Sequence, residues 1–322
     1  MIAYYNATLI GFLPLSLLHA SLTSFWAAKL SEVTVGNPLS VFKIKIESEL
    51  KKLYMNHPGV KLAIARYSRT AINKNASETQ KPLLITSIHI DSGGLTSLPR
   101  LSFFPAATKL QASHNKITEI LDNWNDKIED VDLSDNQLTS FPEIGGVMLM
   151  SLNLSENTLR NITIPRQLPH LMELNLSIQC EKQAAPTDSG GFCSVFSDSF
   201  SQSLFDNCPQ LQSINISMTG ITSLSCLERC DSLRQIICLK NPIENLQDVL
   251  PFLHDRLIYL DLSDCPVAKD RRLFEAVCAK CPDLSFFNSK RYTEQQVRFT
   301  GSKYLREQKR RDISSKDQAR KS

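Results

Sequence analysis

Apolar residues recur along most of this chain at a regular spacing. In the segment Ile128–Leu138 they stand at the first, fourth, sixth and eleventh places, and Asn136 stands at the ninth. A polar residue, Asp132, alternates with the fourth and sixth places, which predicts a short strand with one buried face. The same register starts eight times, with steps of 22, 21, 21, 22, 40, 22 and 24 residues. The starting residues are Ile85, Ala107, Ile128, Leu149, Leu171, Leu211, Leu233 and Leu257.

This spacing is the L-x-x-L-x-L-x-x-N-x-L consensus of a leucine-rich repeat. A single repeat of this length cannot bury its own apolar side, so neighbouring repeats must stack. We therefore predict an α/β fold, a leucine-rich repeat solenoid with a parallel β-sheet on its concave face and short helical or irregular convex segments. The ninth-place asparagines should form a hydrogen-bonded ladder from Asn115, Asn136, Asn157 and Asn241. We expect the ladder to be imperfect at Gly93, Gln179, Thr219 and Cys265.

Residues 1–81 precede the repeats and are expected to form an amino-terminal segment and cap. Residues 7–28 contain no charged side chain, and three interpretations stay open for them: a buried terminal segment, a targeting or membrane-anchoring segment, or an additional repeat. No Lys or Arg precedes this stretch, which argues against a signal peptide. Further on, the pattern predicts an amphipathic helix from Ile46 and a strand over Val60–Tyr67.

The solenoid itself is predicted over residues 82–287. The 40-residue step places an insertion near residues 180–208, which is either a surface loop or an element that contacts a partner. A carboxy-terminal cap is expected from residue 264, with a helix over Lys269–Cys281. Residues 288–322 carry 11 Lys or Arg and 4 Asp or Glu, which predicts a basic helix to about Asp312 and a disordered tail.

Charge and cysteine content bound the class of protein only loosely. The 322 residues hold 36 basic and 33 acidic groups, a balance that does not imply a nucleic-acid partner. The nine cysteines form no dense cluster beside the repeats, which favours a reducing compartment over secretion. Asn-x-Ser sequons at Asn153, Asn175 and Asn215 lie inside predicted strands, where a glycan would block the concave face. We expect a cytoplasmic protein, with a nuclear location open, or a membrane-bound or secreted one if residues 7–28 are a targeting segment.

The register places a set of polar residues on the concave face, where solenoids commonly bind their partners. The predicted partner-binding residues are Glu129, Asp130, Asp132, Asp135, Asn153, Glu156, Glu173, Asn175, Asn215, Tyr259 and Asp261. We predict that their carboxylates attract a basic segment of a partner protein and that Tyr259 anchors it. The alternative is a solvated face without a partner. The same carboxylates would repel a phosphate backbone, so nucleic acid would bind only through the basic tail.

No residue pattern in the chain predicts catalysis, a metal site or a cofactor. The paired carboxylates stand on an open wall, which does not desolvate them for acid–base chemistry. Cys278-x-x-Cys281 resembles half of a zinc site, but Cys208, Cys230 and Cys281 each stand three residues before a repeat-starting leucine. Recurrence at one structural place indicates a small buried residue rather than a metal ligand.

The carboxy-terminal cap has a distinctive sequence, formed by the runs Leu260–Val267, Lys269–Leu273 and Cys281–Asn288. It resembles the cap of intracellular leucine-rich repeat proteins, the group of the regulatory repeat subunit of type-1 protein phosphatase, axonemal dynein light chains and the spliceosomal A-prime protein. Asp264-Cys265-Pro266 departs from the asparagine–proline segment of that group, whereas Asn288 matches its terminal polar place. The resemblance covers about residues 82–310 and implies protein–protein scaffolding without catalysis.

The sequence supports three functional hypotheses. The first is a non-catalytic, monomeric scaffold or regulatory subunit that binds a protein partner on its concave face. The second is a membrane-anchored or secreted leucine-rich repeat protein of the receptor type, which requires residues 7–28 to be a targeting segment. The third is a ribonucleoprotein component that binds RNA through its basic tail.

Overall fold

The computed structural model describes residues 54–70, 76–77, 79–120, 124–144, 148–179, 196 and 199–321. The chain divides into two compact units, residues 1–57 and 58–322, and the second contains all eight repeats. The segment 7–28, the helix expected from Ile46 and most of the insertion near 180–208 lie outside the described residues. Of the helices within those ranges, none combines the length and the apolar character needed to cross a bilayer.

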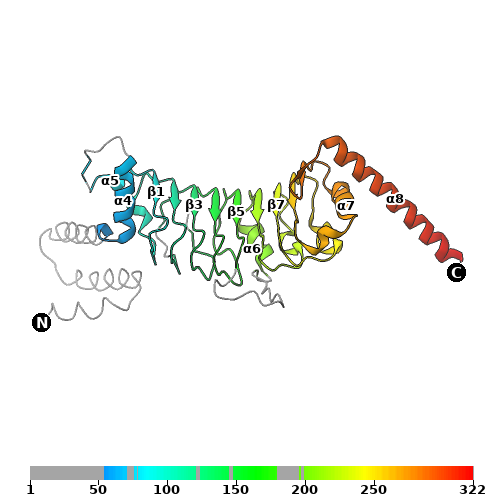
Figure 1. Cartoon of the computed structure of the whole chain (residues 1–322), viewed down its shortest axis with the longest axis horizontal. Coiled ribbons are helices and arrows are strands. Elements are labelled where there is room, and N and C mark those ends of the chain that lie inside the picture. The colour runs from blue at the N-terminus through cyan, green and yellow to red at the C-terminus, as the bar shows by residue number, and fades with distance from the viewer. Residues whose placement is uncertain are drawn as a thin grey trace, which may run out of the picture. The chain divides into compact units, whose positions relative to one another are not determined.

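The eight repeats build one continuous sheet (Figure 1). In every repeat the strand begins two residues after the first apolar residue of the register. Neighbouring strands of the repeats pair in parallel, and the order of the strands in the sheet is their order along the chain. The strands are β1 (Ser87–His89), β2 (Lys109–Gln111), β3 (Asp130–Asp132), β4 (Ser151–Asn153), β5 (Glu173–Asn175), β6 (Ser213–Asn215), β7 (Gln235–Ile237) and β8 (Tyr259–Asp261). The predicted fold class, a leucine-rich repeat solenoid with a parallel sheet, is confirmed.

Two short strands extend the sheet past the last repeat. β9 (Phe286–Phe287) pairs in parallel with β8, and β10 (Lys290–Arg291) turns back antiparallel on β9. The apolar residues of the register form the core beneath the sheet. Around β3, for example, Val131 and Leu133 are 0% exposed, while Asp132 between them is partly exposed. Burying an apolar side chain of this size contributes about 1.5–3 kcal/mol.

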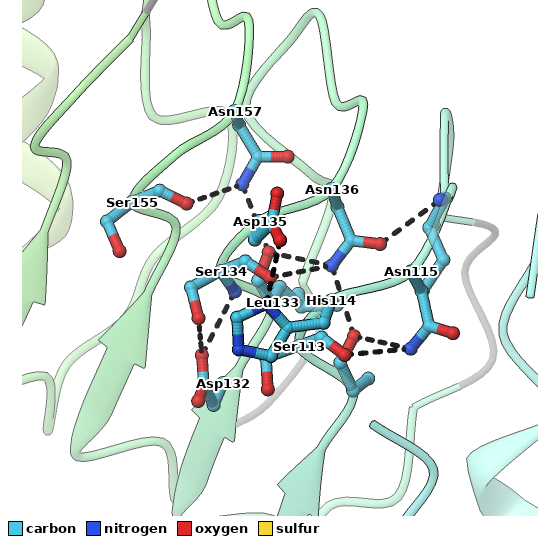
Figure 2. Close-up of polar contacts among 12 residues, drawn as sticks. Ser113, His114, Asn115, Asp132, Leu133, Ser134, Asp135, Asn136, Ser155 and Asn157 are labelled. Atoms are coloured by element: carbon cyan, nitrogen blue, oxygen red, sulfur yellow. Dashed lines mark hydrogen bonds and ion pairs between the residues drawn. The ribbon is translucent and has the colours of Figure 1, made fainter. Parts of the chain in front are cut away.

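The ninth-place asparagines form the predicted ladder between repeats (Figure 2). Asn136 is 0% exposed, and its Oδ1 accepts a hydrogen bond from Ile117 N at 3.1 Å. Its Nδ2 donates to the carbonyl oxygens of Ala112, Leu133 and Ser134 at 3.0–3.1 Å. One side chain thus satisfies backbone groups of its own repeat and of the repeat before it, as buried polar groups require.

The ladder continues through residues that we expected to interrupt it. Gln179 accepts a hydrogen bond from Leu159 N at 3.1 Å and donates one to Leu154 O at 2.9 Å. Thr219 donates its hydroxyl hydrogen to Ile216 O at 2.7 Å. A longer amide or a hydroxyl therefore replaces asparagine and still satisfies the backbone of the turn.

The turn after each strand has the same backbone conformation in all eight repeats. The residue at the eighth place of the repeat has a φ between 51° and 63°, although none of these residues is glycine. They are Ser92, His114, Asp135, Glu156, Ile178, Met218, Lys240 and Asp264. A left-handed φ costs a non-glycine residue about 1–2 kcal/mol, so the neighbouring ladder must hold each turn in place. Two predicted site residues, Asp135 and Glu156, stand on these constrained turns.

The helix α4 (Pro58–Thr70) covers the amino-terminal end of the sheet. The prediction of a strand over Val60–Tyr67 is wrong. The buried side chains have the i, i+3, i+4 spacing of a helix, because they are Val60, Ala63 and Ile64. Arg66 of α4 forms an ion pair with Asp91 of the first repeat. A second, short helix, α5 (Lys81–Leu84), leads into β1.

The predicted carboxy-terminal helices are both present. A 3₁₀ turn, η5 (Pro266–Lys269), leads to α7 (Leu273–Lys280), and α8 (Glu294–Lys321) packs on α7. Gly301 makes this packing close, because a Cβ atom there would lie 2.5 Å from Cys278 O. α8 continues past the predicted end near Asp312 into the residues that we expected to be disordered.

The convex side consists mainly of short turns, namely η1 (Leu101–Phe103), η2 (Leu224–Leu227), η3 (Leu246–Asp248) and η4 (Leu250–Phe252). The end of the insertion forms α6 (Phe200–Asn207), in which Phe200 and Leu204 are 0% exposed. This described part of the insertion therefore belongs to the core and is not a surface loop.

Candidate functional site

The register aligns the predicted site residues on one surface, which we call the sheet face. Consecutive pairing partners across β3 to β6 are Asp132, Asn153, Asn175 and Asn215. A second row, two residues earlier, contains Asp130, Ser151 and Glu173. Neighbouring strands lie about 4.8 Å apart. The side chains that the sequence assigned to a shared wall therefore do share it.

Five predicted site residues have a structural role within their own repeat. The Oδ1 of Asp132 accepts hydrogen bonds from Ser134 N at 3.0 Å and from Ser134 Oγ at 2.6 Å. The same pair of hydrogen bonds recurs at Asn153, Asn175, Asn215 and Asp261, each with the serine two residues later. Each of these five repeats thus uses an acceptor and a serine to close the turn after its strand. The signal was a recurring Asp/Asn-x-Ser triplet, which our sequence analysis noticed only as sequons.

The carboxy-terminal end of the sheet face is more closed than predicted. Asp261 is 3% exposed, and its Oδ2 accepts hydrogen bonds from Ser289 Oγ at 3.0 Å and from Tyr259 OH at 3.3 Å. Burial raises the pKa of the Tyr259 hydroxyl above its ordinary value, and its ring lies 5.7 Å from that of Phe286. Because its carboxylate is buried and hydrogen-bonded, we leave Asp261 out of the exposed surface.

Two of the acidic residues on the sheet face are paired with cations. Lys109 Nζ lies 3.4 Å from Asp130 Oδ2, and His114 Nδ1 lies 2.7 Å from Asp135 Oδ2 (Figure 2). The hydrogen bond to Asp135 raises the pKa of His114 above 6.5; burial opposes the shift, and the nearby negative charges support it. Both pairs are exposed and solvent-screened, so each contributes little to stability. Lys109, and His114 when it is protonated, reduce the negative charge at the amino-terminal side of the acidic patch.

Three glutamates of the sheet face keep an uncompensated charge. In the part of the chain that the structure describes, Glu129, Glu156 and Glu173 form no ion pair; Glu173 Oε2 accepts a hydrogen bond from Ser151 Oγ at 3.5 Å. Glu156 and Glu173 are exposed, and Glu129 is half-buried. The attractive part of the sheet face for a cationic group is therefore the region over β3 to β5.

Sequence analysis missed three methionines in this same region. Met150 and Met172 occupy the second place of their repeats, as Glu129 does in the repeat before. They are 39% and 36% exposed, and Met148 is 47% exposed. The register itself would have identified Met150 and Met172, but the candidates chosen over β3 to β5 were all polar residues. Exposed apolar side chains gathered beside charged ones are typical of interaction sites.

Six of the seven cysteines in the described ranges are buried. All seven cysteines in the described ranges are free. Burial raises the pKa of the Cys208, Cys230, Cys278 and Cys281 thiols to about 12, so these side chains are protonated near neutral pH. The described residues contain no group of three or more His, Cys, Asp or Glu side chains placed to hold a metal ion.

These observations define the class: the chain is a leucine-rich repeat domain protein with an exposed sheet face. An internalin C2 from Listeria monocytogenes has a similar structure, with a TM-score of 0.50 and 17% identity over 69% of this chain and 91% of that chain. An internalin F from the same species has a TM-score of 0.45 and 14% identity over 72% and 75% of the two chains. YopM from Yersinia enterocolitica has a TM-score of 0.43 and 20% identity over 75% and 55%. No family model and no curated protein matches the sequence. At this level of identity, the internalin C2 structure supports the fold alone.

Proposed function

We propose that this protein is a non-catalytic scaffold or regulatory subunit that holds a protein partner on its sheet face over β3 to β5. The observation that carries the proposal is the uncompensated charge of Glu129, Glu156 and Glu173 on a rigid, open sheet. Carboxylates in this position attract a basic segment of a partner and set its orientation. An open sheet leaves them in water, whereas acid–base catalysis works best in a site that excludes it.

The proposed partner site is smaller than the set of residues that the sequence suggested. Asp132, Asn153, Asn175 and Asn215 direct their acceptor oxygens to serines of their own turns. Their replacement would therefore disturb the repeats as well as any contact with a partner. The residues suited to a clean test are the glutamates, because the carboxylates of Glu129 and Glu156 form no hydrogen bond or ion pair in the described part of the chain.

The experiment is a double charge reversal, Glu129→Lys with Glu156→Lys. A matched control is Glu228→Lys with Glu244→Lys, which reverses two exposed glutamates outside the sheet face. We expect proteins that co-purify with the wild type and with the control to be lost with the sheet-face variant, and to be released from the wild type by salt. Equal capture by both double variants would refute the proposal.

We further propose an intracellular location, which the resemblance of the carboxy-terminal cap also implies. The support is that the seven described cysteines are free and that the sequons at Asn153, Asn175 and Asn215 lie in strands, where a glycan would cover the sheet face. Fractionation of cells that express the chain with a carboxy-terminal tag, followed by glycosidase treatment, tests this location. A membrane fraction or a glycosidase-sensitive shift in mass would instead support the receptor-type alternative.

A further inference from the structure

Met148, Met150 and Met172 form an exposed apolar group, the methionine patch, beside the glutamates of the sheet face. Met148 and Met150 flank Leu149, which is 0% exposed, so both side chains turn away from the core. Met172 N donates a hydrogen bond to Met150 O at 2.8 Å. The two residues therefore lie side by side, each directly before its strand, β4 or β5. The patch therefore spans two successive repeats.

The methionine patch and the free glutamates form one continuous surface. Met150 N donates to Glu129 O at 2.8 Å, so Glu129 lies one strand before the patch. Glu173 directly follows Met172, and its carboxylate reaches across to Ser151 Oγ. Across the strands, the patch thus has Glu129 on its β3 side, while Glu173 lies beside Met172 on the same strand and directs its carboxylate toward β4.

This arrangement selects the chemistry of the occupant. Methionine side chains are flexible and polarisable, so they can adjust their conformation to the shape of an apolar partner surface. The bordering carboxylates require Lys or Arg next to those apolar residues. Met150 and Met172 are about 4.8 Å apart across the strands, close to the 5–6 Å between residues i and i+4 of a helix.

We propose that the occupant is a basic amphipathic helix of another protein, which seats apolar side chains on the methionine patch and its Lys or Arg side chains on Glu129 and Glu173. This inference rests on the proposed function and adds the identity of the partner's contact element. The helix crosses the strands over β3 to β5, and its apolar stripe contacts Met150 and Met172 at positions one turn apart.

The test uses the full chain labelled with ¹³C in its methionine methyl groups. The probe is a synthetic 14-residue helix of Leu and Lys with its leucines on one face; a shuffled isomer of the same composition and charge is the control. We expect the amphipathic peptide to shift the methyl signals of Met148, Met150 and Met172 and to leave the signal of Met218, which lies on a turn, unchanged. The shuffled isomer should bind at least tenfold more weakly.

Substitutions then separate this inference from the proposed function. Met150→Ser with Met172→Ser should weaken peptide binding about tenfold, whereas Phe205→Ser, which removes a 49% exposed side chain on α6, should not. If the serine variant lost its fold, Met150→Gln with Met172→Gln would make the same test. Binding that depends on Glu129 and Glu173 but not on the methionines would overturn the inference and leave the proposed function intact. Methyl shifts that grow with protein concentration without peptide would identify a second copy as the occupant and would also overturn it.

Discussion

Replacing Asn136 by alanine tests the reasoning about the ladder most directly. The side chain is 0% exposed and has one accepted and three donated hydrogen bonds. The three carbonyl oxygens keep other donors. Ala112 O still accepts from Asn115 Nδ2, Leu133 O from Asn157 Nδ2 and Ser134 O from His114 N.

The backbone N–H of Ile117 is the group that the substitution leaves without a partner. Asn136 Oδ1 is its acceptor, and no second acceptor for it exists among the described residues. An orphaned buried donor costs about 1–3 kcal/mol, and each lost hydrogen bond about 1 kcal/mol more. With three donated hydrogen bonds also lost, we therefore expect Asn136→Ala to lower the free energy of unfolding by about 4–6 kcal/mol.

Urea denaturation followed by circular dichroism measures this loss. The control is Gln137→Ala, which truncates the exposed neighbour and should change stability by less than about 0.5 kcal/mol. Asn136→Thr should retain part of the stability, because Thr219 occupies the same place with its hydroxyl bonded to Ile216 O. Equal losses for Asn136→Ala and Gln137→Ala would refute the argument, as would unchanged hydrogen exchange at the Ile117 amide.

Three further predictions concern other parts of the chain. Gly301→Ala should destabilise the packing of α8 on α7 by about 1–3 kcal/mol, because its Cβ would lie 2.5 Å from Cys278 O. Proteolysis within α8 should become faster in this variant. The control, Ser302→Ala at the exposed neighbouring residue, should have little effect. His114 has a raised pKa in the folded state, so its pair with Asp135 contributes fully below pH 6.5 and is lost as the pH rises through the folded-state pKa. An NMR titration of the ring should show a smaller upward shift in Asp135→Asn, because the hydrogen bond to Asp135 is the largest cause of the shift. Iodoacetamide at pH 8 should react slowly with four buried thiols in the native protein and readily in urea, because burial raises their pKa to about 12. These thiols are Cys208, Cys230, Cys278 and Cys281. Rapid labelling of the native protein, resolved by mass spectrometry, would contradict the assigned burial.

The sequence predicted where the candidate site lies but not which of its carboxylates are free to contact a partner. The period of the repeat predicted the places of all three glutamates, because each repeat has the same order of strand and turn. Glu173 lies in β5, Glu129 directly precedes β3, and Glu156 lies on the turn after β4. Whether a given carboxylate is free depends on its neighbours. Asp132 bonds to a serine two residues later, while Asp135 pairs with a histidine 21 residues earlier in the chain.

The sequence by itself determined the strands and the asparagine ladder, because both follow from a local pattern repeated at nearly constant spacing. Tertiary structure decided the features that depend on contacts between distant residues. The segment Val60–Tyr67 is helical because one of its faces packs at the end of the sheet, and Asp261 is withdrawn from the surface by the cap that contains Ser289. The methionine patch has both origins. The register gives Met150 and Met172 the place next to a repeat-starting leucine, and the stacking of repeats buries that leucine and brings the two methionines together.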